Sequence, residues 1–458
     1  MIDIINSVFE QVASFGLNLL MFDILFFIEG QTVEFLIAFL IISSIALMFL
    51  LRFPNFKYIL APLKLLRDKT YKKVEFQNSI SSQTAFWSSI AGCVGVGNIT
   101  GMCAAVYFGG AGTIFWIVIC GFITMPLRYA EVLFGHKLRI VEGNAITECG
   151  PFAYIHYAMK NHQHLYGFAI KLFAVLFILA GFGALSVQVN PMVNVIVTNG
   201  NVYIKCAIAL ILCVMIFHIV TGGFKRIAAV ASNLGVVMSL LYIVVILLLL
   251  FYKRENIGNA FALIFHEAFN IKSVYGGILT IIFLACKRAI ISTEVGFGTI
   301  SLLHGRSDRT SSKDEAKLAM IAPFFGTVVF CSLNGLMLVT SGAFTHGDGG
   351  IETMRYAFVN FHPLMNYMLM VIICMFGFST IITWFYYVNS ALKRITSKPL
   401  IIKGLPIVYC FLLFFSALVT FSTILLIIDF TTLLITIPNT IVLLYLVFYF
   451  RKQKKDIF

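Results

Sequence analysis

The chain has 458 residues, of which 60% are hydrophobic and only 12% are charged, and its net charge is +13. Soluble domains carry roughly 25% charged residues, so this composition excludes an ordinary soluble protein and predicts a polytopic membrane protein. The basic balance alone would also fit a nucleic-acid-binding protein, but the positions of the charges, described below, argue against that class.

Long apolar runs predict an all-α protein with about 11 transmembrane helices. A helix of about 20 apolar residues spans a bilayer, and the sequence contains eleven runs near that length. They are 31–52, 82–108, 112–136, 165–196, 202–221, 226–252, 274–300, 314–344, 363–390, 404–428 and 430–450. Residues 1–30 precede them as an external or interfacial segment, and residues 31–81 form an extra helix with a basic loop.

The positions of Lys and Arg predict the orientation. If the loop 52–80 is cytoplasmic and the spans alternate, cytoplasmic segments hold 24 of the 33 Lys and Arg residues, whereas external segments hold four. This split follows the positive-inside rule, so the charge reflects topology and no nucleic-acid partner is expected. The N-terminus is predicted outside and the tail 451–458 in the cytoplasm. The low-charge composition, rich in Ile, Phe and Lys, suggests an AT-rich bacterial genome, so we expect the protein in the plasma membrane of a bacterium.

The ten cysteines form no Cys-x-x-Cys pair, and most lie inside apolar runs. We therefore interpret them as small hydrophobic residues and expect no disulfide framework and no metal site. No cofactor is expected.

The ten spans after the first divide into two units of five, 82–252 and 274–450. Span 82–108 corresponds to 274–300 with an offset of 192 residues. Because each unit has an odd number of spans, the two units would have opposite orientations in the membrane. Inverted repeats are typical of secondary transporters, whose sites lie at the repeat interface near the midplane.

The first helix of each unit is interrupted by glycine. One contains "GCVGVGNITG" (92–101), and the other contains Gly276 and Gly277 at its start and "STEVGFG" (292–298) near its end. Paired interrupted helices are a sequence indication of a transport site. An interruption frees backbone carbonyls, which coordinate cations, and N–H groups at a half-helix N-terminus, which bind carboxylates.

The third helix of each unit carries polar residues at matching positions. "SVQVNPMVN" contains Gln188 and Asn190, and "FGFSTIITWFYY" contains Ser379, Thr380, Thr383 and Trp384. At the offset of 192 residues, Gln188 corresponds to Thr380. Both helices are therefore expected to direct hydrogen-bonding groups to the same central zone.

These stretches together resemble the alanine/glycine:cation symporter (sodium:alanine symporter) family of the amino acid–polyamine–organocation superfamily. The resemblance extends from about residue 31 to 395. The segments that carry it are "GVGNITGM" with "RYAEVLFGHKLR" (95–139), "GGFKRIAAVA" (222–231), "AFALIFHEAF" (260–269), "KRAIISTEVGFGTISLLH" (287–304) and "FGFSTIITWFYY" (376–387).

The resemblance implies a fold of the LeuT type and sodium-coupled symport of a small neutral amino acid, alanine or glycine, across the lipid bilayer. It implies that substrate contacts come from Asn98, Gln188, Thr380 and Trp384, with free N–H groups at Val96 and Gly97, and we add Gly276 and Gly277. By analogy of fold, sodium ligands are expected among Gly92, Cys93, Gly95, Ser379, Thr380 and Thr383.

Three departures from the family pattern leave the substrate and the coupling ion open. The family usually has Thr where this chain has Val96, and Ser-Asn-Glu-Ala-Gly where it has Ser-Thr-Glu-Val-Gly (292–296). It usually has Gly-Glu where this chain has Val388 and Asn389. A proton-coupled carrier, or one of different specificity, is therefore the alternative within the same fold.

Each candidate residue also has a purely structural interpretation. The glycines are compatible with close helix packing, and Gln188 with a bond to a neighbouring helix. Ser379, Thr380 and Thr383 can bond to carbonyls of their own helix, and Trp384 can be ordinary packing. Arg288 and Glu294, charged residues within a span, are expected to form either a gate or a structural pair.

An ion channel is the alternative of a different class, because "CVGVGN" superficially resembles a potassium selectivity filter. A filter lies in a short re-entrant loop of a tetramer, whereas this motif lies within a long span. No nucleophile or metal constellation supports an enzyme, so a transporter remains the preferred interpretation.

Overall fold

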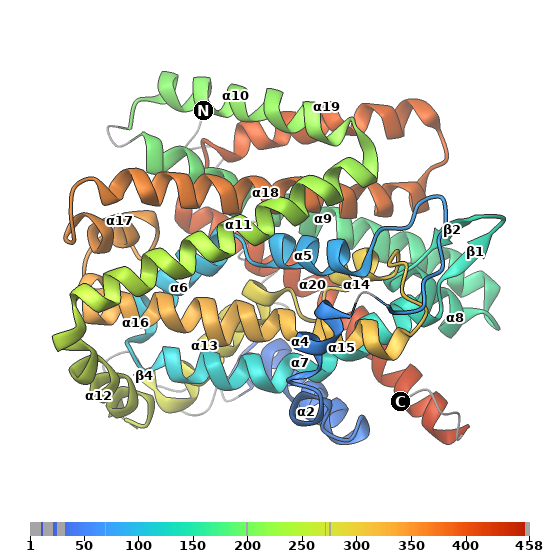
Figure 1. Cartoon of the computed structure of the whole chain (residues 1–458), viewed down its shortest axis with the longest axis horizontal. Helices are drawn as coiled ribbons and strands as arrows, with labels where there is room; N and C mark the ends of the chain where they lie inside the picture. Colours follow the sequence, from blue (N-terminus) through green and yellow to red (C-terminus); the bar gives the residue numbers. More distant parts are fainter. Residues whose placement is uncertain are drawn as a thin grey trace.

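The computed structural model describes residues 11, 22–24, 33–68, 70–197, 200–270, 272–273 and 276–453. Most of the described chain is helical (Figure 1). The helices of the first half are α2 (Phe35–Leu50), α3 (Pro54–Lys57), α4 (Ala61–Arg67), α5 (Ser82–Cys93), α6 (Val96–Gly109), α7 (Thr113–Lys137), α8 (Pro151–Met159), α9 (Gln163–Ile196), α10 (Val202–Val220) and α11 (Gly223–Tyr252).

The second half contains α12 (Ile257–Ala268), α13 (Ile278–Thr293), α14 (Thr299–His304), α15 (Ser312–Pro323), α16 (Ser332–Thr340), α17 (Ile351–Val359), α18 (Met365–Ile395), α19 (Pro399–Ser416) and α20 (Phe421–Lys452). Short helical turns are η1 (Arg254–Asn256), the π-helix η2 (Phe324–Cys331) and η3 (Ala343–Thr345). Two small antiparallel pairs complete the list, β1 (Ile140–Glu142) with β2 (Ala145–Glu148) and β3 (Lys272–Ser273) with β4 (Gly276–Gly277).

The predicted polytopic membrane protein is confirmed. Within the described residues, nine helical spans are long and apolar enough to cross a membrane. Each of the other two expected spans contains a 16-residue helix, α2 or α13. The count of eleven crossings, the inverted repeat and the proposed domain limits stay predictions. The interfacial segment 1–30 lies almost entirely outside the described residues, and residues 454–458 of the tail 451–458 lie outside them as well.

The two predicted helix interruptions are present. The first helix divides into α5 and α6, and Gly95 at the N-terminus of α6 is extended, with φ −110° and ψ −170°. The second divides into α13 and α14, and three residues of the connection, Glu294, Gly296 and Gly298, have positive φ. Glycine adopts this conformation without steric cost, whereas Glu294 at φ 54° is a strained exception.

The long helix α9 packs on both α18 and α20 at the centre, and α18 also packs on α5 and α11. Helices α10 and α19 lie together at the edge (Figure 1). Their outward residues are large and apolar, among them Leu210, Val214, Ile407 and Phe411. An exposed apolar face of this extent is expected for helices that contact lipid.

The predicted boundary between the last two spans is wrong. We expected it at residue 429, the one charged position in a long apolar run, but α19 ends at Ser416 and α20 begins at Phe421. Asp429 lies inside α20 and is 4% exposed, because Lys287 and Arg288 of α13 compensate its charge. A charge with partners can lie within a span, so it does not mark a loop.

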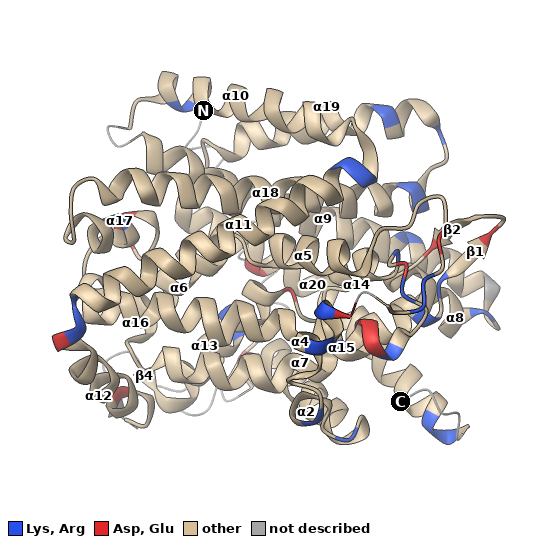
Figure 2. Ribbon diagram, viewed as in Figure 1, with Lys and Arg blue, Asp and Glu red and all other residues tan. Residues whose placement is uncertain are grey.

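Lys and Arg gather at one end of the molecule, around α8, β1, β2 and the adjacent ends of α18 and α19 (Figure 2). The opposite ends of the long helices carry few charges. The separation agrees with the positive-inside pattern of the sequence, and we refer to the basic end as the predicted cytoplasmic side.

Candidate functional site

A small cavity of about 30 Å³ lies where the two interrupted helices meet α9, α18 and α20. We call it the central cavity. It is lined by Gly92, Cys93, Gly95, Gly97, Asn98, Ala184, Val187, Gln188, Ile291, Ser292, Glu294, Phe297, Thr380, Trp384, Ile428 and Thr432. Both interruptions and both third helices therefore contribute to one site, which is the arrangement expected from the sequence.

The N-terminus of α6 faces Gln188 of α9. The backbone N–H of Val96 donates to Gln188 Oε1 at 2.7 Å. The first N–H groups of a helix have no intrahelical acceptor and carry a partial positive charge. An amide oxygen thus occupies the position on α6 where a carboxylate would bind most strongly.

Asn98 caps the same helix end, since its Oδ1 accepts from the N–H of Gly95 at 3.3 Å. Its Nδ2 is buried and has no hydrogen-bond partner among the described residues. A buried donor without an acceptor costs free energy, so this amide is a group that an incoming acceptor would stabilise.

The hydroxyls of α18 contact the end of α5. Ser379 Oγ and Thr380 Oγ1 each donate to the carbonyl oxygen of Ala91 at 3.1 Å. Thr383 instead donates to the carbonyl of Ser379 in its own helix, at 2.8 Å. Ser379 and Thr380 are therefore next to the last carbonyls of α5, as an ion site would require. Thr383 fits the structural interpretation, and so does Ser379 in part, because its hydroxyl also lies 3.0 Å from the carbonyl of Phe376 in its own helix.

Gly276 and Gly277 are not part of this site. They form β4 and the N-terminus of α13, and the 16 residues of α13 separate them from the interruption by about 24 Å at 1.5 Å per residue. The expectation was wrong because these glycines begin the helix, whereas the interruption uses Gly296 and Gly298.

The predicted pair of Arg288 with Glu294 is also wrong. Arg288 NH1 contacts Asp429 Oδ1 at 3.0 Å, and Lys287 contacts both Asp429, at 3.3 Å, and Glu34, at 3.0 Å. These ion pairs therefore join α13 to α20 and to the N-terminus of α2. The strained connection after Thr293 turns Glu294 away from Arg288 and toward the central cavity.

Glu294 is a cavity residue to which we had assigned another role. Its Oε1 accepts from Trp384 Nε1 at 2.6 Å and its Oε2 accepts from Thr299 Oγ1 at 2.7 Å. The side chain is 6% exposed and Trp384 is 1% exposed. The signal was available in "STEVGFG", where a charged residue lies within an interrupted helix. Ile428 and Thr432 of α20 gave no comparable signal.

Two charges of α7 bind the two ends of the second interruption. Arg128 donates to the carbonyl of Thr293, the last residue of α13, at 2.6 Å. Glu131 accepts from the N–H of Gly298, which precedes α14, at 3.0 Å. Each charge has the sign that its helix end favours, and the two side chains pair with each other at 2.7 Å with no exposure.

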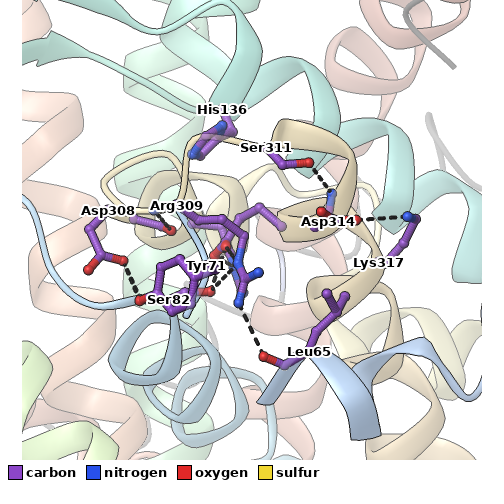
Figure 3. A network of polar contacts seen from close by, with 12 residues as sticks. Leu65, Tyr71, Ser82, His136, Asp308, Arg309, Ser311, Asp314 and Lys317 are labelled. Carbon is purple, nitrogen blue, oxygen red and sulfur yellow. Dashed lines mark hydrogen bonds and ion pairs between the residues drawn. The ribbon is translucent and has the colours of Figure 1, made fainter. Parts of the chain in front are cut away.

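On the predicted cytoplasmic side, a polar network fixes the start of α5 to the segment before α15 (Figure 3). The N–H of Ser82 donates to Asp308 at 3.0 Å, and its hydroxyl donates to Glu315 Oε2 at 2.7 Å and accepts from Arg309 Nε at 3.2 Å. Tyr71 donates to the same oxygen of Asp308 at 2.8 Å. We call these five residues the α5 clamp.

Backbone bonds extend the α5 clamp along the chain. The segment before α5 pairs with the segment after α14 through Ile80 N to Arg306 O at 3.0 Å and Asp308 N to Ile80 O at 2.9 Å. Burial and the bond to Asp308 raise the pKa of Tyr71 to about 12. Its hydroxyl therefore keeps its proton and remains a donor throughout the physiological range.

Known structures and sequences agree with this architecture. The chain superposes on MhsT in complex with L-phenylalanine with a TM-score of 0.53 at 14% identity, covering 82% of this chain and 99% of that one. It superposes on a Na⁺-coupled sialic acid symporter with a TM-score of 0.50 at 14% identity, covering 91% and 83%. These likenesses show a fold of the LeuT type.

Among sequence relatives, the sodium/alanine symporter AgcS of Methanococcus maripaludis is 27% identical over 68% of this chain and 70% of its own length. The probable sodium/glutamine symporter GlnT of Bacillus subtilis is 29% identical over 77% and 73%. The model of the sodium:alanine symporter family matches residues 21–457. The chain therefore belongs to the sodium:alanine symporter family, whose members are membrane transporters and not enzymes.

Proposed function

We propose that this protein is a sodium-coupled symporter of small neutral amino acids, with the central cavity as the substrate site. The observation that carries the proposal is the meeting of both helix interruptions at one buried cavity. This cavity contains a donor, Asn98 Nδ2, that has no hydrogen-bond partner in the described part of the chain. Family membership supports a cation-coupled amino-acid carrier.

The residues favour a zwitterion. A substrate carboxylate would replace Gln188 as the acceptor of the Val96 N–H and would also accept a hydrogen bond from Asn98. On the opposite side of the cavity, the negative C-terminal end of α13 and the carboxylate of Glu294 favour an ammonium group. Release of Gln188 from Val96 would free its oxygen as a further acceptor. Substrate would thus replace bonds that the protein makes to itself.

We propose that a sodium ion binds at the C-terminal end of α5. The last carbonyls of α5 lack intrahelical donors, and the hydroxyls of Ser379 and Thr380 reach Ala91 in this region. Sodium bound there would tie α5 to α18 and so couple ion binding to the position of the first interrupted helix.

The size of the cavity favours alanine or glycine over larger solutes. At about 30 Å³ it is small, and Trp384 forms part of its wall. GlnT carries the name of a glutamine symporter, so glutamine is the competing substrate within the family, and it would require a larger displacement of the wall.

Alternating access requires one side to open while the other is closed. The α5 clamp closes the predicted cytoplasmic side by fixing the start of α5. Release of sodium and substrate to the cytoplasm would therefore require the clamp to open.

The test is uptake of labelled alanine, glycine and glutamine into proteoliposomes under an inward sodium gradient, with a proton gradient as the second condition. Sodium-dependent accumulation of alanine or glycine is expected, and Asn98→Ala and Gln188→Ala are expected to abolish it. Asn360→Ala, at an exposed residue outside the cavity, is the matched control. Accumulation driven only by protons, or normal uptake by both cavity variants, would contradict the proposal.

A further inference from the structure

A second cavity, of about 270 Å³, lies on the predicted cytoplasmic side between the end of α18, the start of α11, α14 and β2. We call it the basic vestibule. Three of the residues that line it are cations, Arg306, Lys393 and Arg394, and none of its lining residues is Asp or Glu. It lies in the region where Lys and Arg gather (Figure 2).

Only one carboxylate compensates these charges among the described residues. Glu148 forms an ion pair with Arg394, and it also accepts from His156 Nδ1 at 3.0 Å. Arg306 has no carboxylate partner in the described part of the chain; its Nε donates to Tyr386 Oη at 2.8 Å and NH1 to the carbonyl of Ile146 at 3.2 Å. The vestibule therefore carries an excess of positive charge.

Lys393 is the group that remains free to bind. Its side chain is exposed in the vestibule, and it makes no hydrogen bond or ion pair within the described ranges. Arg306 and Arg394, in contrast, are held in fixed orientations by neutral acceptors and by Glu148. Fixed guanidinium groups beside a mobile ammonium make a preorganised site for oxygen anions.

Polar side chains of α18 also line the vestibule, although the hydroxyl of Ser390 donates to the carbonyl of Tyr386 in its own helix at 2.8 Å. Asn389 and Ser390 line the same wall of α18, and Tyr386 lies two residues after Trp384 of the central cavity. The hydroxyl of Tyr386 donates to the carbonyl of Leu302 at 3.3 Å, which joins α18 to α14 at the inner end of the vestibule. The vestibule thus lies nearer to the C-terminal end of α18 than the central cavity does.

We propose that the basic vestibule binds a small oxyanion, which Lys393 contacts directly and Arg306 and Arg394 attract. The ligand chemistry is that of a phosphate or a carboxylate. Its source is either a free anion of the cytoplasm or the carboxylate of a departing amino acid. The binding itself does not depend on which solute the protein transports.

The first experiment measures the unfolding temperature of the purified full-length protein in uncharged detergent as inorganic phosphate replaces chloride at constant ionic strength. The midpoint is expected to rise and saturate, because a ligand that binds only the folded state stabilises it. Lys393→Gln is expected to raise the half-saturating phosphate concentration about tenfold, the contribution of one charge-assisted contact. Lys398→Gln, an exposed lysine outside the vestibule, is the matched control and should behave as the parent protein.

No phosphate-dependent shift, or the same shift in all three proteins, would overturn the proposal. Because this assay involves no transport, its result is independent of whether the protein carries alanine.

A second experiment separates the two sources by using acetate in the unfolding assay and alanine efflux from proteoliposomes. A substrate-carboxylate site predicts that acetate reproduces the shift and that Lys393→Gln raises the internal, but not the external, half-saturating alanine concentration. A free-anion site predicts that internal phosphate alters efflux in the parent protein and not in Lys393→Gln. If Lys393→Gln behaves as the parent protein in the acetate assay and in both efflux conditions, the vestibule is not a functional oxyanion site.

Discussion

The indole Nε1 of Trp384 donates to Oε1 of Glu294 at 2.6 Å, joining the middle of α18 to the interruption between α13 and α14. Trp384→Phe keeps an aromatic ring and removes the donor, so the buried carboxylate loses a partner. We expect a loss of about 1–3 kcal/mol of unfolding free energy. Trp116→Phe, which removes a 2.9 Å bond to the carbonyl of Ala268 in a half-buried position, is expected to cost less. Thermal unfolding in detergent measures both variants. Equal losses of unfolding free energy would show that the bond from Trp384 to Glu294 stabilises the protein no more than the bond from Trp116 does.

Gly95 has no room for a side chain. A Cβ atom at this position would lie 2.7 Å from both Gln188 Oε1 and Thr380 Oγ1. Gly95→Ala is therefore expected to displace both groups, to cost about 1–3 kcal/mol and to abolish uptake. Gly101→Ala, in the same helix, should fold normally and transport, because a Cβ atom there would meet no atom within 4 Å. Uptake by the Gly95 variant at the parent rate would refute the assigned geometry.

Gln188→Glu tests whether the end of α6 is an anion site. A carboxylate at this position would bind the N–H of Val96 more strongly than the amide does. We expect the variant to fold at least as well as the parent protein and to lose substrate binding, because the built-in carboxylate competes with that of the amino acid. Binding is measured by the alanine-dependent rise in unfolding temperature. An undiminished rise would show that the substrate carboxylate binds elsewhere.

Ser82→Ala removes the centre of the α5 clamp. Arg309 and Glu315 then lose their shared hydroxyl. They keep their 3.5 Å contact with each other, and Glu315 keeps its 2.6 Å contact with His304. We expect a shift toward the conformation in which the start of α5 is released. In that conformation a small thiol reagent should alkylate Cys93 of the central cavity faster, and mass spectrometry measures the rate. Ser81→Ala, which removes the cap of α5 at Thr84 N but no contact of the clamp, should leave the rate nearly unchanged. The reverse order of rates would exclude this role of the clamp.

Glu131→Gln leaves the buried guanidinium of Arg128 without its counter-charge. Removing one partner of a buried pair costs about 3–5 kcal/mol, so we expect a large fall in the unfolding temperature. Glu352→Gln breaks the pair with Arg355, in which the Glu352 side chain is 47% exposed, and should cost no more than about 1 kcal/mol. Similar falls in the two variants would mean that Glu131 does not stabilise the interruption.

Much of the architecture could be predicted because a bilayer imposes long apolar helices and a strong charge asymmetry. The interruption at Gly95 was also predictable, since several glycines surround one asparagine within an apolar run. Gln188 and Trp384 were predicted to lie near the interrupted helices, on the basis of their side-chain chemistry and their positions in the third helices. The structure brings them to one cavity, and their roles stay predictions.

The errors have a common physical cause, which is that a sequence shows a charge but not its partner. The boundary between the last two spans was predicted at Asp429, whose partners Lys287 and Arg288 lie about 140 positions earlier in the chain. Glu294 was paired with Arg288 because the two are close in sequence, but the left-handed backbone at Glu294 changes the direction of the side chain. Backbone conformation and long-range pairing determine the partners of Asp429 and Glu294, and the local composition of the sequence does not reveal either of these.

Arg128 and Glu131 also constrain how this half of the molecule can move. They are less than one turn apart on a single helix, and each is bonded to a different end of the same interruption. The separation between α13 and α14 is thus set by the geometry of α7. A displacement of α14 that left α7 in place would break the bond between Glu131 and Gly298, so we expect α7 and the second interruption to move together during transport.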